Sequence, residues 1–109
     1  MASILTLDLE RKSVIININK ITYIQFDTEE IIEPIHIPNY LEISFGNRDD
    51  NVDDISFSTN HYSFEVLKQL FEIILAMMEQ SDSKHNFSKR LKITKESIEE
   101  IKSIYFINK

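Results

Sequence analysis

The chain contains a single glycine, Gly46, in 109 residues, and it has no cysteine. A phosphate-binding loop requires several glycines, so that backbone N–H groups can approach the ligand. A thiolate metal site or a redox pair requires cysteine. The inventory therefore excludes glycine-rich phosphate loops and cysteine-based sites. Function has to be inferred from the fold class and from the distribution of charge.

Length and composition fit one globular domain spanning residues 1–109. Apolar residues form 42% of the chain and charged residues 28%, close to the averages for globular proteins. The N-terminal segment 1–4 lacks a basic stretch and a long apolar run, so we expect no secretory signal. No apolar run reaches the length needed to span a bilayer. Together with the absence of cysteine, these features predict a cytoplasmic protein.

Short segments in the first half of the chain alternate between inward and outward side chains, with the period of a half-buried β-strand. Enrichment in β-branched and aromatic residues also favours strands. The expected strands are residues 5–9, 14–18, 22–26, 41–45 and 55–58. The last two predict a hairpin around a polar loop, residues 46–54. In the long connection 27–39, Pro34 and Pro38 argue against a central strand.

The clearest helix is predicted over residues 64–80, where apolar residues cover an arc of about 200° at the α-helical period. Ser63 is the expected N-cap. An arc this wide exceeds what one sheet face covers, so a second element or a partner is expected to cover the rest. If no second helix covers it, Val66, Ile73 and Met77 should form an exposed stripe that calls for a partner.

The C-terminal region is expected to supply a second helix. Thr94 is a possible N-cap, and Ile98, Ile101 and Tyr105 follow at helical spacing. Residues 103–108 are also β-branched and aromatic enough to form a strand. Residues 81–90 are predicted to be a polar linker.

These elements predict an α+β domain in which an antiparallel meander of about five strands is covered by two C-terminal helices. One set of apolar residues should form its core. The set is Leu5, Leu7, Ile16, Ile24, Leu41, Ile43, Phe57, Leu67, Leu70, Phe71, Ile74, Met78 and Ile101.

Charge is unevenly distributed along the chain, which has a net charge of −6. Residues 21–83 contain 13 acids and two bases, whereas residues 84–109 contain seven bases and three acids. Such asymmetry bears on the choice of partner and on association rate, not on the fold. The basic cluster Lys84, Lys89, Arg90, Lys92 and Lys95 is a weak nucleic-acid signal in a chain of pI near 5.0, so we expect no direct nucleic-acid binding.

No catalytic or metal site is predicted. The acidic run 49–54 has oxygen ligands at alternating positions like a calcium loop, but Asp54 replaces the required glycine and Asn60 the closing glutamate. His36, His61 and His85 are too far apart in sequence for a helical metal clip. No carboxyl group shows the burial pattern that would raise its pKa for general acid catalysis. We therefore expect no cofactor and no enzymatic activity.

Two acidic segments are the predicted partner-binding site. If the connection 27–39 and the loop 46–54 lie at one end of the sheet, they form one negative surface for a basic protein. A plain solubility surface is the alternative. The predicted binding residues are Glu29, Glu30, Glu33, Asp49, Asp50, Asp53 and Asp54.

In size, acidity and lack of cysteine, the chain resembles bacterial immunity proteins that block nuclease toxins. It also resembles phage-encoded, anti-CRISPR-like inhibitors of nucleic-acid-handling defence enzymes. No motif is specific to either group. The leading hypothesis is a non-enzymatic inhibitor of a basic toxin or defence nuclease. The alternatives are an assembly module that forms a homodimer through its helix face and, third, a small enzyme with a carboxylate site.

Overall fold

The first hairpin follows directly from the period-2 pattern near the N-terminus. The structure is a computed structural model that describes residues 3–27, 30–32, 35–37, 40–45, 54–81 and 85–107. Strands β1 (Ile4–Asp8) and β2 (Ser13–Asn17) pair in antiparallel fashion, with Leu5 opposite Ile16 and Leu7 opposite Val14. The predicted first two strands are thus confirmed.

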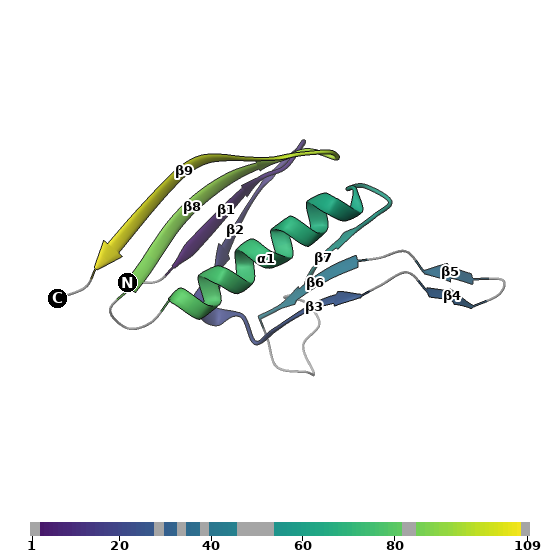
Figure 1. Ribbon diagram of the computed structural model, residues 1–109, viewed down its shortest axis with the longest axis horizontal. Coiled ribbons are helices and arrows are strands. Elements are labelled where there is room, and N and C mark those ends of the chain that lie inside the picture. Colours follow the sequence, from purple (N-terminus) through teal and green to yellow (C-terminus); the bar gives the residue numbers. More distant parts are fainter. Residues whose placement is uncertain are drawn as a thin grey trace.

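Two strands from the C-terminal region complete the sheet that this hairpin begins. Strand β8 (His85–Ile93) lies parallel to β1, and β9 (Ile98–Ile107) pairs antiparallel with β8. The order across the sheet is β2-β1-β8-β9. A parallel pair requires a long crossover between its strands. Here the crossover contains every element between β1 and β8 (Figure 1).

A second, three-stranded sheet forms from the middle of the chain. The 3₁₀ turn η1 (Ile18–Lys20) separates β2 from β3 (Tyr23–Asp27), so the third predicted strand is not continuous with the second. Strand β6 (Tyr40–Ser44) lies between β3 and β7 (Ile55–Ser58), antiparallel to both. The predicted hairpin over residues 41–45 and 55–58 is therefore confirmed.

The proline-containing connection between β3 and β6 carries a small hairpin of its own. Strands β4 (Glu30–Ile32) and β5 (Ile35–Ile37) pair only with each other and join neither larger sheet. This agrees with the prediction that prolines keep the segment out of a central strand. Figure 1 shows this pair extending beyond the rest of the molecule. The whole chain measures 56 Å along its longest axis.

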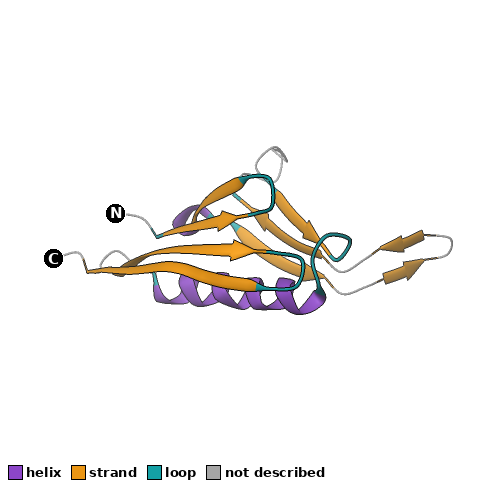
Figure 2. Cartoon of the chain, turned by 90° about the horizontal axis from the view of Figure 1, so that it is seen from above, coloured by secondary structure: helices purple, strands orange, loops and turns teal. Residues whose placement is uncertain are grey.

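Helix α1 (Phe64–Gln80) begins and packs as its sequence predicts. The Ser63 side chain accepts a hydrogen bond from the Val66 backbone N–H at 3.2 Å, which confirms the N-cap. The helix lies under the four-stranded sheet (Figure 2) and also contacts β3 and β6 of the three-stranded sheet.

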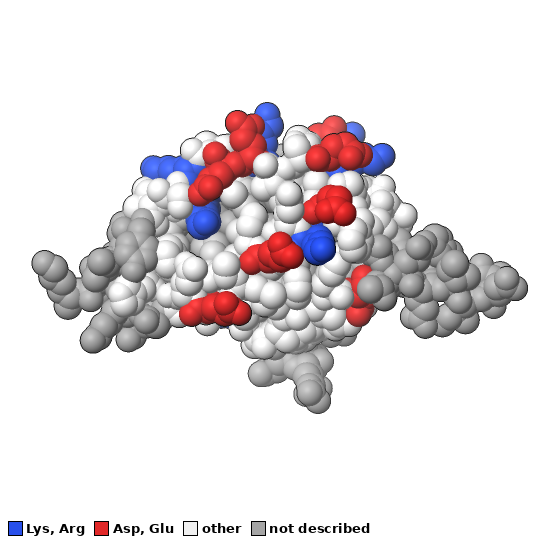
Figure 3. Space-filling view, in the orientation of Figure 1, with Lys and Arg blue, Asp and Glu red and all other residues white. Residues whose placement is uncertain are grey.

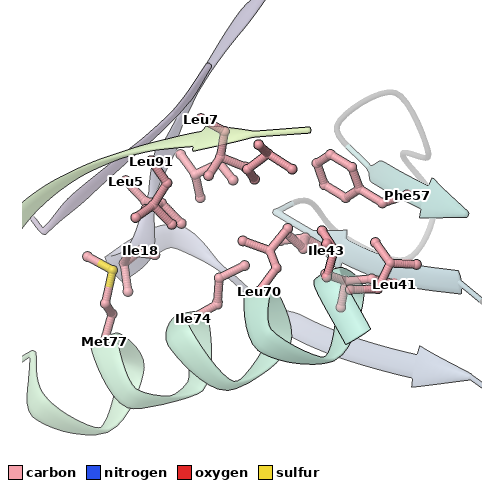
Figure 4. Close-up of a cluster of buried hydrophobic side chains, with 14 residues drawn as sticks. Leu5, Leu7, Ile18, Leu41, Ile43, Phe57, Leu70, Ile74, Met77 and Leu91 are labelled. Atoms are coloured by element: carbon pink, nitrogen blue, oxygen red, sulfur yellow. The ribbon is translucent and has the colours of Figure 1, made fainter. Parts of the chain in front are cut away.

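The core is the space that α1 shares with both sheets. Figure 4 shows helix side chains such as Leu70, Ile74 and Met77 directed toward side chains of the four-stranded and three-stranded sheets. At most 4% of the surface of any of these side chains is exposed. The buried set is Leu5, Leu7, Ile16, Ile18, Leu41, Ile43, Phe57, Val66, Leu67, Leu70, Ile74, Met77, Leu91 and Ile93.

The predicted fold class, α+β, is confirmed, but the meander with two helices is wrong. The described residues contain one α-helix, and the predicted linker 81–90 largely belongs to β8. Thr94 caps no helix: its hydroxyl accepts a hydrogen bond from the Ser97 N–H at 3.1 Å, inside the β8–β9 turn. The same side-chain chemistry that caps helices closes turns, so the cap signal was ambiguous.

A β-bulge explains why the last strand resembled a helix. The register between β8 and β9 shifts after Arg90, and Ile101 is the extra residue on β9. The bulge breaks the alternation of a regular strand, so the isoleucines follow each other at intervals of three. Ile101 is consequently 53% exposed, whereas a core position was predicted.

The other core predictions hold in most cases. Nine of the thirteen residues are buried, whereas Ile24, Phe71 and Met78 are half-buried. The conditional stripe on α1 is not exposed: Val66 and Met77 are each 2% exposed and Ile73 is half-buried. Because α1 packs against two sheets, most of its wide apolar arc is covered within the chain, although Phe64 at its start remains 39% exposed.

A buried polar network fixes the start of β1. Ser3 is fully buried, and its hydroxyl lies 2.6 Å from the Ser81 hydroxyl and accepts a hydrogen bond from the Phe87 N–H at 3.0 Å. Its backbone N–H donates to Asn19 Oδ1 at 2.7 Å. Four separate elements are thereby joined at one end of α1. None of the described residues forms a helix that is long and apolar enough to cross a membrane.

Candidate functional site

The outward side of the three-stranded sheet carries a compact group of polar side chains. Because successive side chains of a strand point to opposite faces, Leu41 and Ile43 face the core while their neighbours face away from it. The same alternation applies to β3 and β7. We call this surface the acidic sheet face, and it comprises Tyr23, Gln25, Asp27, Tyr40, Glu42, Ser44, Asp54, Ser56 and Ser58.

Hydrogen bonds link the tyrosines of the acidic sheet face to its carboxylates. The Tyr23 hydroxyl donates to Glu42 Oε1 at 3.1 Å. Asp27 accepts from Gln25 Nε2 at 2.6 Å and also from the phenol of Tyr40. These bonds tie the phenol groups of Tyr23 and Tyr40 to the carboxylates of the face.

Hydrogen bonds on this face shift the pKa of one of its acids and of both its tyrosines. The hydrogen bonds from Tyr40 and Gln25 keep the pKa of Asp27 below its ordinary value. The same bond raises the pKa of Tyr40 to about 12, because losing the phenol proton would leave two adjacent negative charges. The pKa of Tyr23 is raised by burial first and by its hydrogen bond to Glu42 second.

Charge on this sheet has one sign throughout its described part. Residues 21–27, 40–45 and 54–58 include three acids, Asp27, Glu42 and Asp54, and neither lysine nor arginine. Asp54 accepts a hydrogen bond from the Ser44 hydroxyl at 2.6 Å, which directs its carboxylate toward the same face. The three carboxylates therefore give this face of the sheet a negative electrostatic potential.

The predicted binding residues lie mostly outside the described part of the chain. Glu29, Glu33, Asp49, Asp50 and Asp53 fall outside the described residues. The Glu30 backbone belongs to β4, and Asp54 directly precedes β7.

The two predicted acidic segments attach to opposite ends of the three-stranded sheet, not to one end. The described chain leaves the sheet after Asp27 and returns at Tyr40, which is its register partner. It leaves the other end of β6 after Phe45 and returns at Asp54. The acidic sheet face lies between these two ends.

The tyrosines and Glu42 of this face were not included among the candidate binding residues predicted from the sequence. The alternation in β3 and β6 indicated that these side chains share one face, since Tyr23, Tyr40 and Glu42 occupy the positions that point away from the core. The prediction weighed acids by their number in connecting segments. It therefore overlooked single acids placed side by side by strand register.

Basic residues gather on the other sheet. Lys89, Arg90 and Lys92 lie on β8 and Lys95 lies in the β8–β9 turn, while Lys84 falls outside the described residues. Arg90 donates to both carboxylate oxygens of Asp8, at 2.6 and 3.0 Å, and keeps the pKa of Asp8 below its ordinary value. The basic cluster is thus partly neutralised within its own sheet.

The helix adds separate acids to a third surface. Glu65, Glu72 and Glu79 are exposed on α1 beside one base, Lys68. Figure 3 shows acidic side chains at intervals along the middle of one side of the molecule, where α1 runs. Lysines and arginines gather with acids along its upper edge, over the four-stranded sheet.

Geometry for metal binding or acid–base catalysis does not emerge in the described part of the chain. Within it, no group of three or more His, Asp or Glu side chains could hold a metal ion. His61 is exposed before α1, His85 begins β8, and the His36 backbone belongs to β5. Of the carboxyl groups on described residues, Asp8 and Asp27 have a shifted pKa, and both shifts are downward. Lowered values suit charged hydrogen-bond acceptors rather than proton donors.

Comparison with known proteins gives no further guide. No protein-family model matches the chain, and neither a curated protein nor a solved structure matches it.

Proposed function

We propose that this protein is a cytoplasmic, non-enzymatic binding protein that blocks the positively charged surface of a nucleic-acid-handling partner protein. The observation that carries the proposal is the acidic sheet face, where three carboxylates and two tyrosines lie together without a lysine or arginine among the described residues of that sheet. A partner that binds nucleic acid presents the opposite charge. Occupying that surface would exclude the nucleic acid.

Tyrosine and carboxylate have different roles in such an interface. Tyr23 is 43% exposed and supplies a large, rigid contact whose hydroxyl is already anchored on Glu42. Aromatic side chains of this kind dominate binding energy at protein interfaces. The carboxylates act at longer range, since complementary charge raises the association rate and excludes wrong partners. A rigid sheet supports both roles because little ordering cost remains to be met on binding.

The two predicted acidic segments join the three-stranded sheet beside this surface. Their attachment points lie at the two ends of the acidic sheet face, at Asp27 and Tyr40 and at Phe45 and Asp54. Seven acids in these segments were the predicted site. We propose that they extend the negative surface of the sheet rather than form it alone.

The homodimer alternative has less support. It depended on an apolar helix face without a cover within the chain, but Val66 and Met77 are buried. The enzyme alternative lacks a carboxyl group with a raised pKa among those with a shifted value. We therefore favour the inhibitor.

The test compares two surfaces that carry the same charge. The binding variant replaces Asp27, Glu42 and Asp54 with Asn, Gln and Asn, and the control replaces Glu65, Glu72 and Glu79 with Gln. Both change the net charge by the same amount, and the control acids are exposed on α1. The partner is first captured from the native host at low and then moderate salt and identified. Its association rate and nucleic-acid competition are then measured.

We expect the binding variant to associate at least about tenfold more slowly at low salt, with a weaker salt dependence and less competition with nucleic acid. The helix control should associate nearly as fast as the parent chain. Equal losses in both variants would mean that net charge alone attracts the partner. The acidic sheet face would then have no specific role.

A further inference from the structure

A cleft opens on the side of the molecule where the two larger sheets part. It is bounded by the β1–β2 turn, the connection from β7 to α1 and the β8–β9 turn. Its larger part is a cavity of about 990 Å³, and a neighbouring cavity of about 290 Å³ runs between β2 and β7. The two cavities share Leu9, Lys12, His61 and Tyr62 in their walls. We call them together the basic-rimmed cleft.

Backbone hydrogen bonds hold the walls of this cleft in place. The Leu9 N–H donates to the Lys12 carbonyl at 2.8 Å and closes the β1–β2 turn. The Ser63 N–H donates to the Lys95 carbonyl at 2.7 Å, which ties the β8–β9 turn to the start of α1. Tyr62 is fixed by its N–H bond to the Ser58 carbonyl at 3.1 Å. A ligand would therefore enter a preformed site.

The interior of the cleft is lined by half-buried apolar side chains. Leu9, Val14, Ile55 and Tyr62 pack against the core on one side, and each keeps part of its surface uncovered. The Tyr62 ring also meets Phe57 edge-on, with ring centroids 5.7 Å apart. This wall runs from the larger cavity into the smaller one, so it offers an elongated apolar track. An apolar chain in that track would remove this surface from water.

Cations surround the opening of the cleft. Arg11, Lys12 and Lys95 come from two different turns, and Lys92 also lines the larger cavity. Among the described residues, no ion pair within 4.0 Å occupies Arg11, Lys12 or Lys95. Of the two acids in the wall, Asp8 is held by Arg90 and Ser13, which leaves Glu10. The rim thus has an excess of positive charge facing an apolar interior.

We propose that the basic-rimmed cleft binds a free, single-chain anionic amphiphile. The carboxylate or phosphate head lies at Arg11, Lys12 and Lys95, and the aliphatic chain follows Leu9, Val14, Ile55 and Tyr62. Charge complementarity selects the head, and the apolar track selects the chain. This site overlaps the acidic sheet face only at Ser56 and Ser58 in the wall of the smaller cavity, and the charged residues of the two surfaces are different.

The experiment uses the full chain and three soluble probes below their micelle concentrations. Dodecanoate has both features, dodecyltrimethylammonium has the same chain with the opposite charge, and acetate has the head without the chain. Binding is followed by calorimetry and by chemical-shift changes in the backbone amides. We expect dodecanoate to bind in the micromolar to low millimolar range and to shift Leu9 and Tyr62. The other two probes should bind at least about tenfold more weakly.

A pair of charge-matched variants separates the cleft from general electrostatics. The cleft variant is Lys12→Gln with Lys95→Gln, and the control is Lys68→Gln with Lys102→Gln, two exposed lysines outside the cleft. The cleft variant should weaken dodecanoate binding about three- to tenfold, because each exposed pair contributes modestly, while the control should bind like the parent chain.

Three results would overturn the proposal. Equal affinity for dodecyltrimethylammonium would show that the rim charge selects nothing. Equal weakening in the cleft and control variants would show that the site lies elsewhere. Co-sedimentation with phosphatidylserine vesicles without binding of monomeric dodecanoate would assign the lysines to a membrane surface instead of a free ligand.

Discussion

Truncating two side chains of similar size tests the position of the C-terminal strands directly. Leu91 in β8 is 2% exposed, whereas Ile101 in β9 is 53% exposed at the bulge. Changing either residue to alanine removes the same number of carbon atoms. In a two-helix fold, Ile101 would lie in the core seam and residues 81–90 would be linker. The structure reverses this ranking, because β8 is an inner strand of the four-stranded sheet.

The magnitudes follow from burial. Leu91→Ala loses a fully buried side chain and leaves a cavity between β8 and α1, so we expect a loss of about 2–5 kcal/mol in the free energy of unfolding. Ile101→Ala removes a side chain that is already half hydrated, and solvent fills the space. Its expected cost is about 1 kcal/mol.

Urea denaturation of both variants measures this difference, with the slope m checked for constancy. Leu91→Ala should lower the urea midpoint by more than about 1 M, and Ile101→Ala should lower it by less than about 1 M. An Ile101→Ala variant that loses as much stability as Leu91→Ala would refute the sheet order and restore the helical alternative.

Four further outcomes can be measured on the isolated protein or with its partner. Ser3→Ala should cost about 1–3 kcal/mol, because it removes the buried hydroxyl that accepts from the Phe87 N–H and bonds to the Ser81 hydroxyl, and chemical denaturation would detect this. In a spectroscopic titration of the four tyrosines, one should titrate near pH 12, and Asp27→Asn should bring its pKa down. The Tyr40 bond stabilises the fold fully below pH 10, and this contribution disappears as pH rises through about 12. Asp8 has a lowered pKa in the folded state, so it stabilises the fold at pH values above its unfolded pKa near 3.8. This stability is lost as the pH falls through the folded pKa. Arg90→Gln should therefore make the loss of stability at acid pH less steep, as measured by denaturation across the acid range. With the partner in hand, Tyr23→Ala should mainly raise the dissociation rate, by about tenfold or more, whereas Lys20→Gln should leave it unchanged.

Local patterns were sufficient for five strands and the helix of the first 80 residues, because these elements are defined by near neighbours, but they did not predict η1 or the β4–β5 hairpin. The alternation in β1, β2, β3, β6 and β7 and the N-cap at Ser63 depend on residues a few positions apart. The same is true of the acidic sheet face, whose tyrosines and acids could have been placed from the alternation once β3 and β6 were paired. What the sequence did not contain was the pairing itself.

The C-terminal region could not be assigned locally, because its structure depends on a distant strand. Strand β8 has few apolar residues, and it is fixed by parallel pairing with β1, for example Leu7 opposite Leu91. No short-range pattern reports a contact between residues more than eighty positions apart. The bulge at Ile101 then removed the alternation that would have identified β9.

The acidic sheet face and the basic-rimmed cleft carry opposite charge, so they should attract different ligands. The charged residues in the described part of the three-stranded sheet are all acids, while Arg11, Lys12 and Lys95 line a cleft beside the turns of the four-stranded sheet. A basic partner would approach the first surface and be repelled from the second, which fixes its orientation before contact. Neutralising Lys12 and Lys95 should therefore leave the association rate with such a partner unchanged or raise it slightly. A slower association in that variant would mean that the partner contacts the cleft, and the two surfaces would have to be treated as one interface.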